Sequence, residues 1–201
     1  MRLRVTVADY NVGNLHSVKK AFEKNGAAVD VTADMKDLAN ADCIVFPGVG
    51  AFDMTMEKLL PHREEIRERL LSGVPALGIC IGVQILFGSS EEGVSEGVGL
   101  FKGKITKLGA RRVPHMGWNS VMTDDPLLDG IADRTFYFAH SYVCAADDMD
   151  RIIGTTEYEG NEFPSLFRTA NTYGTQFHPE KSSESGLALI KNFIHFAEDR
   201  V

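Results

Sequence analysis

The sequence predicts an α/β fold: an open, mostly parallel sheet flanked by helices, with antiparallel hairpins added in the second half. In the first half, short apolar runs alternate with segments of helical periodicity. The segments between those runs are long enough for right-handed crossovers between parallel strands. From Val98 to Gln176 the candidate strands are short and separated by turn residues, which favours hairpins. The length of 201 residues fits one domain over 1–201.

The first half carries four predicted strands and two predicted helical segments. The strands are Arg4–Ala8, Ala28–Thr32, Cys43–Phe46 and Ala76–Ile79. Asn14 is placed to cap a helix that runs to about Asn25, where Gly26 ends it. A second helical pattern runs from Glu57 to Leu71. The strand Cys43–Phe46 is apolar throughout, which indicates burial on both faces of the sheet.

The second half is predicted to contain short strands and one long helix. The strands are Ile105–Leu108, Ser120–Met122, Thr135–Ala139, Ile152–Tyr158, Ser165–Arg168 and Thr172–Gln176. Apolar residues at helical spacing predict a final helix over Ser185–Glu198. We expect the hairpins to lie on or beside the parallel sheet.

The formal net charge of −7 argues against general nucleic-acid binding, which requires a basic surface. A local exception is the basic cluster, which consists of Lys102, Lys104, Lys107, Arg111 and Arg112. This cluster is either the solvated face of a hairpin or a docking surface for an acidic patch or a phosphate.

The cysteines and the apolar runs indicate the compartment. The three cysteines do not form a disulfide-framework pattern, so a reducing environment is the simpler expectation. The N-terminal residues lack the pattern of a signal peptide. The longest uncharged apolar run, Gly73–Gly88, is shorter than the ~20 residues that a membrane helix needs. We expect a cytoplasmic protein, and the sequence has no spacing typical of a metal or nucleotide site.

The segment Gly78-Ile79-Cys80-Ile81-Gly82 has the form of a nucleophile elbow. Glycines two positions before and after Cys80 permit the strand and the following helix to pass closely. A thiol at this position projects at the carboxyl end of the sheet, where the sites of open α/β folds lie. The alternative is ordinary core packing, which we assign to Cys43 and Cys144.

His178-Pro179-Glu180 supplies a candidate base and an acid to orient it. Pro179 favours an extended conformation at His178, and residues two apart in an extended chain point the same way. Glu180 is therefore expected to accept a hydrogen bond from one ring nitrogen, which leaves the other to exchange a proton with Cys80. Taken alone, the segment is also typical of a surface turn. The other histidines, among them His115 and His140, have neither an elbow nor a paired acid nearby in the sequence.

The segment after the third predicted strand is a candidate oxyanion site. An acyl-transfer reaction requires two donors for the tetrahedral oxyanion. We expect one donor from the backbone N–H of Ile81 and the other from Gly48, Val49 or Gly50. An ordinary strand-to-helix turn would explain the same glycines.

Together, Pro47–Gly50, Gly78–Gln84 and His178–Glu180 resemble the class I (triad) glutamine amidotransferases over essentially the whole chain. The resemblance implies that Cys80 attacks the side-chain amide of glutamine and forms a thioester. It also implies that His178 protonates the departing ammonia and then activates water, with Glu180 as its orienter. The implied glutamine pocket is lined by Gln84, Glu92, Ser141 and Tyr142.

Further stretches are similar to one branch of that family, the glutaminase subunits of imidazole glycerol phosphate synthase. These stretches are Asp9–Leu15, Pro114–Asn119 and His178–Ser182. The resemblance implies a 1:1 heterodimer in which a cyclase subunit with a β/α-barrel fold receives the ammonia. The expected interface residues are Asn14, Trp118, Tyr137 and Lys181. Trp118 has core packing as its alternative interpretation.

Three other functions stay open at this point. The first is the glutaminase subunit of another synthase, such as pyridoxal phosphate synthase. The second is a different cysteine hydrolase, for instance a peptidase. The third is a binding protein that kept the fold without activity, although such a scaffold does not need Cys80, His178 and Glu180 together.

Overall fold

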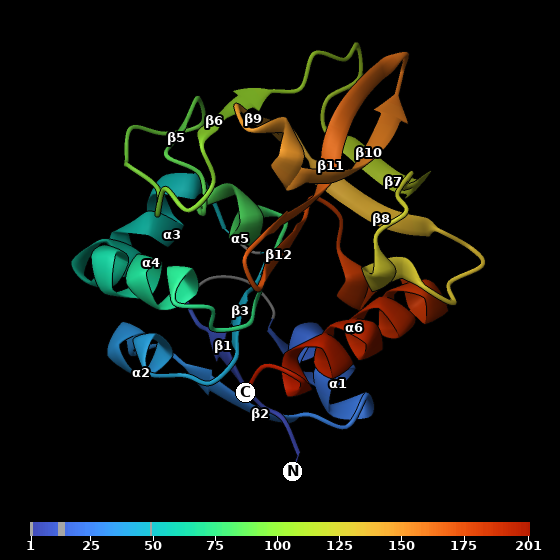
Figure 1. Ribbon diagram of the computed structural model, residues 1–201. Helices are drawn as coiled ribbons and strands as arrows, with labels where there is room; N and C mark the ends of the chain where they lie inside the picture. Colours follow the sequence, from blue (N-terminus) through green and yellow to red (C-terminus); the bar gives the residue numbers. More distant parts are fainter. Residues whose placement is uncertain (1, 12–14, 49) are drawn as a thin grey trace.

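The computed structural model describes residues 2–11, 15–48 and 50–201. Its centre is a seven-stranded sheet in the order β10-β11-β12-β4-β3-β1-β2 (Figure 1). The parallel strands are β1 (Arg4–Ala8), β2 (Ala28–Thr32), β3 (Ile44–Phe46), β4 (Ala76–Ile79) and β12 (Thr172–Thr175). The strands β10 (Ile152–Tyr158) and β11 (Asn161–Thr169) extend the sheet in antiparallel fashion beyond β12. The predicted α/β architecture is confirmed.

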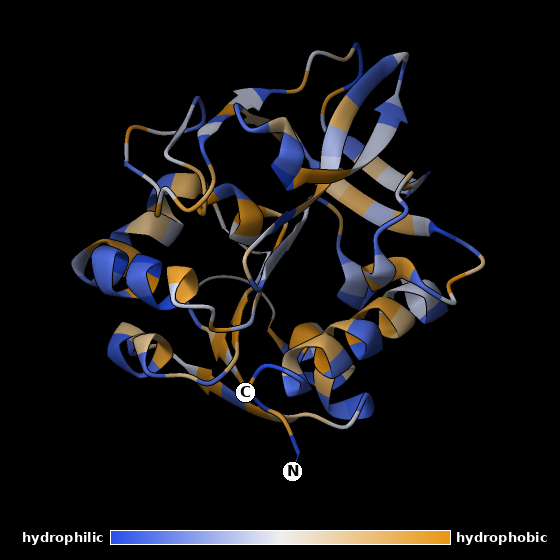
Figure 2. Ribbon diagram, in the orientation of Figure 1, coloured by the Kyte–Doolittle hydropathy of each residue, from blue (hydrophilic) through white to orange (hydrophobic). Residues whose placement is uncertain are grey.

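Helices cover both faces of the sheet (Figure 1). On one face lie α1 (His16–Lys24) and α6 (Ser183–Glu198), which meet through the rings of Phe22 and Phe193. The other face is covered by α2 (Met35–Ala39), α3 (Phe52–Leu59), α4 (Arg63–Leu71) and α5 (Ile81–Gln84). Figure 2 shows apolar residues along the central strands and polar residues on the outer turns of α4. The central strands β3, β4 and β12 are therefore buried on both faces, whereas the edge strand β2 stays partly exposed.

Two smaller sheets are formed by the second half of the chain. One contains β5 (Ser89–Ser90), β6 (Gly103–Lys107) and β9 (Tyr142–Ala146), and the other contains β7 (His115–Ser120) and β8 (Thr135–His140). Short 3-10 helices complete the described chain: η1 (Leu60–His62), η2 (Pro126–Leu128), η3 (Met149–Arg151) and η4 (Pro179–Lys181). A backbone bridge between Tyr137 and His178 joins β8 to the segment that follows β12.

The strands β1, β2, β4 and β10 have the bounds that the sequence predicted. The strand predicted over Ser120–Met122 is wrong, because β7 ends at Ser120 and Met122 forms only an isolated bridge with Thr155. The elements α2 and β9 were not predicted. With five residues, α2 is too short for a periodic pattern, and the cap that Asp34 gives it is the clearer signal.

The helical pattern predicted over Glu57–Leu71 is two helices in the structure. The first begins at Phe52, and η1 separates it from α4. Pro61 lies in this interruption, because a proline in a helix interior removes a hydrogen bond and clashes with the preceding turn. Gly26 follows α1 with φ +97°, as the predicted helix end requires, whereas the expected cap Asn14 lies outside the described residues. Within the described residues, no helix is both long enough and apolar enough to span a membrane.

Candidate active site

Three neighbouring parallel strands end at the candidate site. In the register of the sheet, Phe46 on β3 pairs with Gly78 on β4, and Gly78 pairs with Gly174 on β12. Two residues further along each strand, Gly48, Cys80 and Gln176 follow at corresponding positions. The sheet therefore brings the glycine segment, the thiol and the segment before His178 to one edge.

The backbone at Cys80 has the strained conformation of a nucleophile elbow, with φ 51° and ψ −110°. The flanking glycines are required by close approaches of the backbone. A Cβ atom on Gly82 would collide with the carbonyl oxygen of Phe46, and one on Gly78 would lie 2.7 Å from the carbonyl oxygen of Gly82. A non-glycine residue with positive φ costs on the order of 1–3 kcal/mol, so packing around the turn must hold the cysteine in place.

His178 and Glu180 form the pair that the sequence predicted. The Nδ1 atom of His178 lies 2.8 Å from Oε1 of Glu180, and the two side chains are only 3% and 4% exposed. His178 is extended, with φ −104° and ψ 92°, but Glu180 lies in the 3-10 turn η4. The two side chains therefore meet across a turn. The expectation that they would point the same way along an extended chain is wrong, although the predicted contact between them is present.

The charge state of His178 depends on its two neighbours. Burial lowers the pKa of His178, but attraction and hydrogen bonding to Cys80 and Glu180 outweigh it and raise the pKa to about 10. Both neighbours therefore favour the protonated, charged form of His178, which is a proton donor next to the Cys80 sulfur.

Gly48 lies in the space between the base and the nucleophile. A Cβ atom on Gly48 would be 2.8 Å from Cε1 of His178 and 3.0 Å from Cβ of Cys80. Any larger residue would push the imidazole away from the sulfur. Gly50 has φ +94°, a conformation that glycine adopts without strain. Val49 lies outside the described residues, and the oxyanion role of Gly48, Val49, Gly50 and Ile81 stays a prediction.

A cavity of about 280 Å³ opens beside Cys80. All four residues predicted for the glutamine pocket line this cavity, namely Gln84, Glu92, Ser141 and Tyr142. Gly50 and Ile81 line it as well. Glu92 is exposed, and its Oε2 accepts a hydrogen bond from the backbone N–H of Phe52 at 3.1 Å. This bond fixes a carboxylate at the rim of the cavity.

Two further residues contact the thiol and were missed by sequence reasoning. The sulfur of Cys80 lies 3.8 Å from the carbonyl oxygen of Ala139 and 3.7 Å from Nε2 of Gln176. Gln176 is fully buried. Its position two residues before His178, at the end of a predicted strand, was the only signal that the sequence offered.

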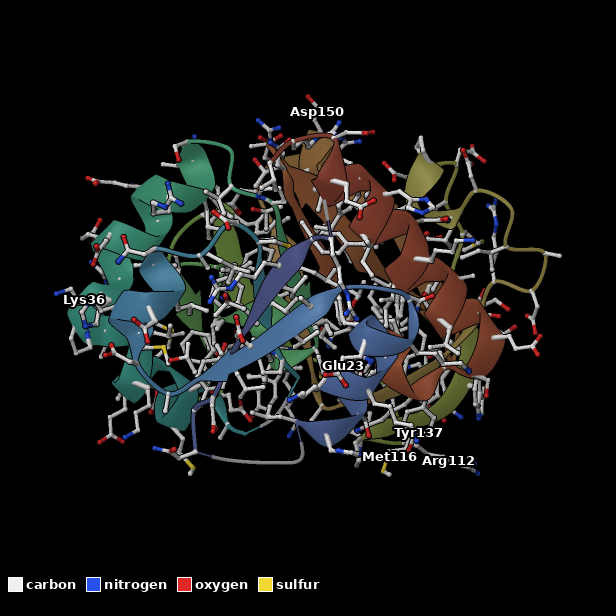
Figure 3. The ribbon with its side chains drawn as sticks, turned by 90° about the horizontal axis from the view of Figure 1, so that it is seen from below. Glu23, Lys36, Arg112, Met116, Tyr137 and Asp150 are labelled. Atoms are coloured by element: carbon white, nitrogen blue, oxygen red, sulfur yellow. The ribbon has the colours of Figure 1, made fainter. Side chains whose placement is uncertain are left out.

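The residues predicted for the partner interface lie on β7, β8 and η4. Trp118 is 53% exposed, which excludes the core-packing interpretation, and its ring contacts that of Tyr137 edge-on with 6.1 Å between ring centroids. Met116 is 64% exposed and also lines the cavity beside Cys80. Figure 3 shows Met116 and Tyr137 at the same edge of the molecule. Lys181 is exposed, and Asn14 lies outside the described residues.

Carboxylates partly neutralise the basic cluster. Lys104 forms an ion pair of 3.3 Å with Glu91, and Arg112 lies 3.9 Å from Glu159. These contacts favour the interpretation as a solvated face. In the described part of the chain, no group of three or more His, Cys, Asp or Glu residues is arranged to hold a metal ion.

The family model of "Glutamine amidotransferase class-I" matches residues 6–196. The chain belongs to the class I glutamine amidotransferases. Members of this family are enzymes that hydrolyse glutamine, and the Cys80 site lies within the matched residues. The fold agrees as well: the structure of PurLQS from Thermotoga maritima superposes with a TM-score of 0.74 at 19% identity, covering 98% of this chain and 99% of that one.

Within the class I glutamine amidotransferases, the chain is similar to subunits of one synthase. The chain is 46% identical to "Imidazole glycerol phosphate synthase subunit HisH" of Methanocaldococcus jannaschii, over 94% of this chain and 98% of the relative. It is 42% identical to the protein of the same name from Natronomonas pharaonis, over 98% of this chain and 96% of the relative.

Proposed function

We propose that this chain is the glutaminase subunit of an imidazole glycerol phosphate synthase, working as one glutamine amidotransferase domain over 1–201. The observation that carries the proposal is the Cys80 elbow beside the buried His178–Glu180 pair. The names of relatives similar over nearly the full length support the choice of synthase. The cytoplasm, expected from the cysteine pattern, is part of the proposal, since the three thiols are free.

The proposed reaction starts from the thiolate–imidazolium pair. The thiolate of Cys80 attacks the side-chain amide carbon of glutamine, and the carbonyl electrons move onto oxygen. Collapse of this tetrahedral species breaks the C–N bond, and the His178 imidazolium gives its proton to the leaving nitrogen, which departs as ammonia. His178, now neutral, takes a proton from water as the water attacks the glutamyl thioester. Glutamate leaves and the thiolate is restored.

Glu180 is proposed to act through His178 rather than on the substrate. Its carboxylate accepts the Nδ1 hydrogen, so the Nε2 atom is the one left to exchange protons with sulfur and substrate. The negative charge also stabilises the imidazolium that waits for the leaving group. Gly48, Val49, Gly50 and Ile81 are proposed to supply the backbone donors for the oxyanion.

We place glutamine in the cavity beside Cys80. Glu92 at the rim would hold the substrate ammonium, and Gln84, Ser141 and Tyr142 would contact the rest of the molecule. The position of these four side chains around one cavity supports the assignment.

The proposed partner is a cyclase subunit with a β/α-barrel fold, bound 1:1 at the exposed strand β7. Trp118 is the expected anchor, with Tyr137, Lys181 and Asn14 as further contacts. The contacts of Tyr137 suggest how docking would reach the triad. Its carbonyl oxygen accepts a hydrogen bond from the backbone N–H of His178 at 2.8 Å, and its own backbone N–H donates to Oγ of Ser182 at 2.9 Å. Movement of β8 would therefore displace the catalytic histidine.

Cys80→Ala tests the nucleophile. Glutamate release from glutamine should fall by at least about 10⁴-fold, because no other group forms the thioester. With the cyclase subunit present, synthesis driven by added ammonium salt should continue, which is the control for folding and docking. Glutamate release near the wild-type rate would contradict the assignment of Cys80.

Trp118→Ala tests the docking surface. Loss of a central aromatic anchor should weaken binding of the cyclase subunit by about 10- to 30-fold, measured by calorimetry. The isolated subunit should be nearly idle, and its stimulation by the cyclase should require higher cyclase concentrations in the variant. Met149→Ala is the matched control, because Met149 is a similarly exposed apolar residue on η3. Equal effects of the two substitutions would exclude Trp118 from the interface.

A further inference from the structure

The sulfur of Cys80 faces a side-chain amide that the proposed triad does not use. The Nε2 atom of the buried Gln176 lies 3.7 Å from Sγ, a distance within the range for hydrogen bonds to sulfur. The Oε1 atom of Gln176 accepts a hydrogen bond from Nε2 of Gln84 at 3.1 Å. Because the oxygen end of this amide is engaged by a donor, the NH₂ end is the one that faces the sulfur.

The hydrogen bonds continue from Gln84 through two histidines to the exposed strand β7. Nε2 of Gln84 also donates to the carbonyl oxygen of Tyr142 at 3.0 Å, and Nδ1 of His140 lies 2.9 Å from that oxygen. Nε2 of His140 lies 3.0 Å from Nδ1 of His115. Nδ2 of Asn119 lies 3.4 Å from Nε2 of His115. Asn119 is the neighbour of Trp118 on β7, so this series of hydrogen bonds joins β7, the proposed docking strand, to the sulfur of Cys80.

Donors and acceptors are fully defined when both imidazoles are neutral: the histidine bonds run toward the carbonyl oxygen of Tyr142, which also accepts from Gln84, and the bonds from Gln84 run on to Gln176 and the sulfur. Burial lowers the pKa of His115 to about 4 and that of His140 to about 3, so neither ring is charged near neutral pH. His140 must carry its proton on Nδ1, because a carbonyl oxygen can only accept. Its Nε2 is then an acceptor, so His115 donates to it from Nδ1 and accepts from Asn119 through Nε2. Rotating the Gln84 amide would break both of its bonds.

We propose that Gln176 donates a hydrogen bond to the Cys80 thiolate, and that Gln84, which donates to both the Tyr142 carbonyl and Gln176, fixes the direction of this donor. A hydrogen bond to the charged form of an acid favours that form. The thiol form has a different partner, since the S–H group can donate to the carbonyl oxygen of Ala139 at 3.8 Å. Gln176 thus contacts the reacting atom, Gln84 is a positioning residue, and His140 and His115 support it by holding the Tyr142 carbonyl. The inference rests on the proposed role of Cys80 as the nucleophile.

Other titratable groups surround the sulfur and set the background of any pH measurement. They are His178, Glu180, His140, Glu92 and Cys144. Gln176→Met leaves all of them in place, keeps a similar volume and removes only the amide. Thr156→Val is the matched control, because it removes another fully buried polar group, the hydroxyl that donates to Ser165, without touching Cys80.

The test is the rate of alkylation by iodoacetamide as a function of pH, with modification at Cys80 verified by peptide mass. In Gln176→Met the midpoint of the pH profile should move up by about one unit, equivalent to about tenfold less thiolate at a fixed pH below the midpoint. His140→Phe should shift the midpoint in the same direction by less, and Thr156→Val should not shift it. The pH profile of kcat/KM for glutamate release should move in parallel.

Gln176→Glu is the second variant, for the case that Gln176→Met does not fold. It keeps the volume and an oxygen for Gln84, but it places a carboxylate oxygen against the sulfur, so the midpoint should rise further. An unchanged midpoint in a folded variant of either kind would overturn the role of Gln176. Glutamate release that survives in Cys80→Ala would instead contradict the nucleophile assignment, so the two failures are distinguishable.

Discussion

His178 and His140 are both buried beside Cys80, yet their pKa values shift in opposite directions. His178 faces the Glu180 carboxylate and the Cys80 sulfur, and its pKa rises to about 10 despite burial. The hydrogen-bond partners of His140 are neutral, namely the ring of His115 and the carbonyl oxygen of Tyr142, and burial, with a smaller repulsion from His115 and His178, lowers its pKa to about 3. The difference teaches that burial alone does not set the charge of an imidazole, because the charge of its hydrogen-bond partners decides the sign.

The two histidines also differ in what their charge states permit them to do. A charged imidazole beside a thiolate can deliver a proton to a leaving group. A neutral imidazole between a donor and an acceptor can only hold its neighbours in one orientation. Substitution of the two residues should therefore affect chemistry at His178 and geometry at His140.

His178→Ala should give the largest loss. Glutamate release in the presence of the cyclase subunit should fall by at least about 10³-fold, since general acid–base catalysis is removed and the thiolate loses its counter-charge. Steady-state measurement of glutamate checks it. His195→Ala is the control, because His195 is exposed on α6. A loss below tenfold would place His178 outside the chemistry and remove the contrast with His140.

Glu180→Gln should give a smaller loss. The amide oxygen can still accept the Nδ1 hydrogen, but the charge that stabilises the imidazolium is gone. A hydrogen bond to a charged group contributes roughly 1.5–3 kcal/mol, so kcat/KM should fall by about 10- to 100-fold. Comparing kcat/KM of this variant with that of His178→Ala ranks the two residues. Activity equal to the wild type would exclude Glu180 as the orienter.

The neutral histidine pair should give the smallest effect, on stability in acid. His115 and His140 titrate near 6.5 when unfolded and at about 4 and about 3 when folded. The unfolded chain therefore binds more protons between these values, and the stability that the pair contributes is present above pH 6.5 and lost as pH falls. The free energy of unfolding in urea should drop between pH 7 and pH 5 by up to about 2 kcal/mol for each of the two histidines.

The double variant His115→Gln, His140→Gln should lose less stability than the wild type over the same pH interval. Near-UV circular dichroism at pH 7 is the control for its native packing. An equal loss in both proteins would show that other groups cause the acid response.

Much of the fold could be predicted because strand signals in the first half are local. Ala76–Ile79 is buried throughout, so its apolar run is continuous and its bounds are clear, and in Arg4–Ala8 only Arg4 is exposed. The strand β7 was misplaced because Met116, Trp118 and Ser120 are exposed and alternate with small or polar residues. An exposed strand of this kind owes its position to pairing with β8 rather than to its own composition.

The candidate site likewise has features that the sequence predicts and features that depend on the tertiary structure. The sequence by itself determined the elbow, because glycines at 78 and 82 are needed for close backbone approaches around Cys80. It also determined the His178–Glu180 pair, whose members lie two residues apart. Only the tertiary structure decided that Gln176 contacts a sulfur 96 positions away, and that His115 meets His140 across 25 positions. Such contacts depend on the register of paired strands, and a local pattern of residues carries no information about which distant strand lies beside it.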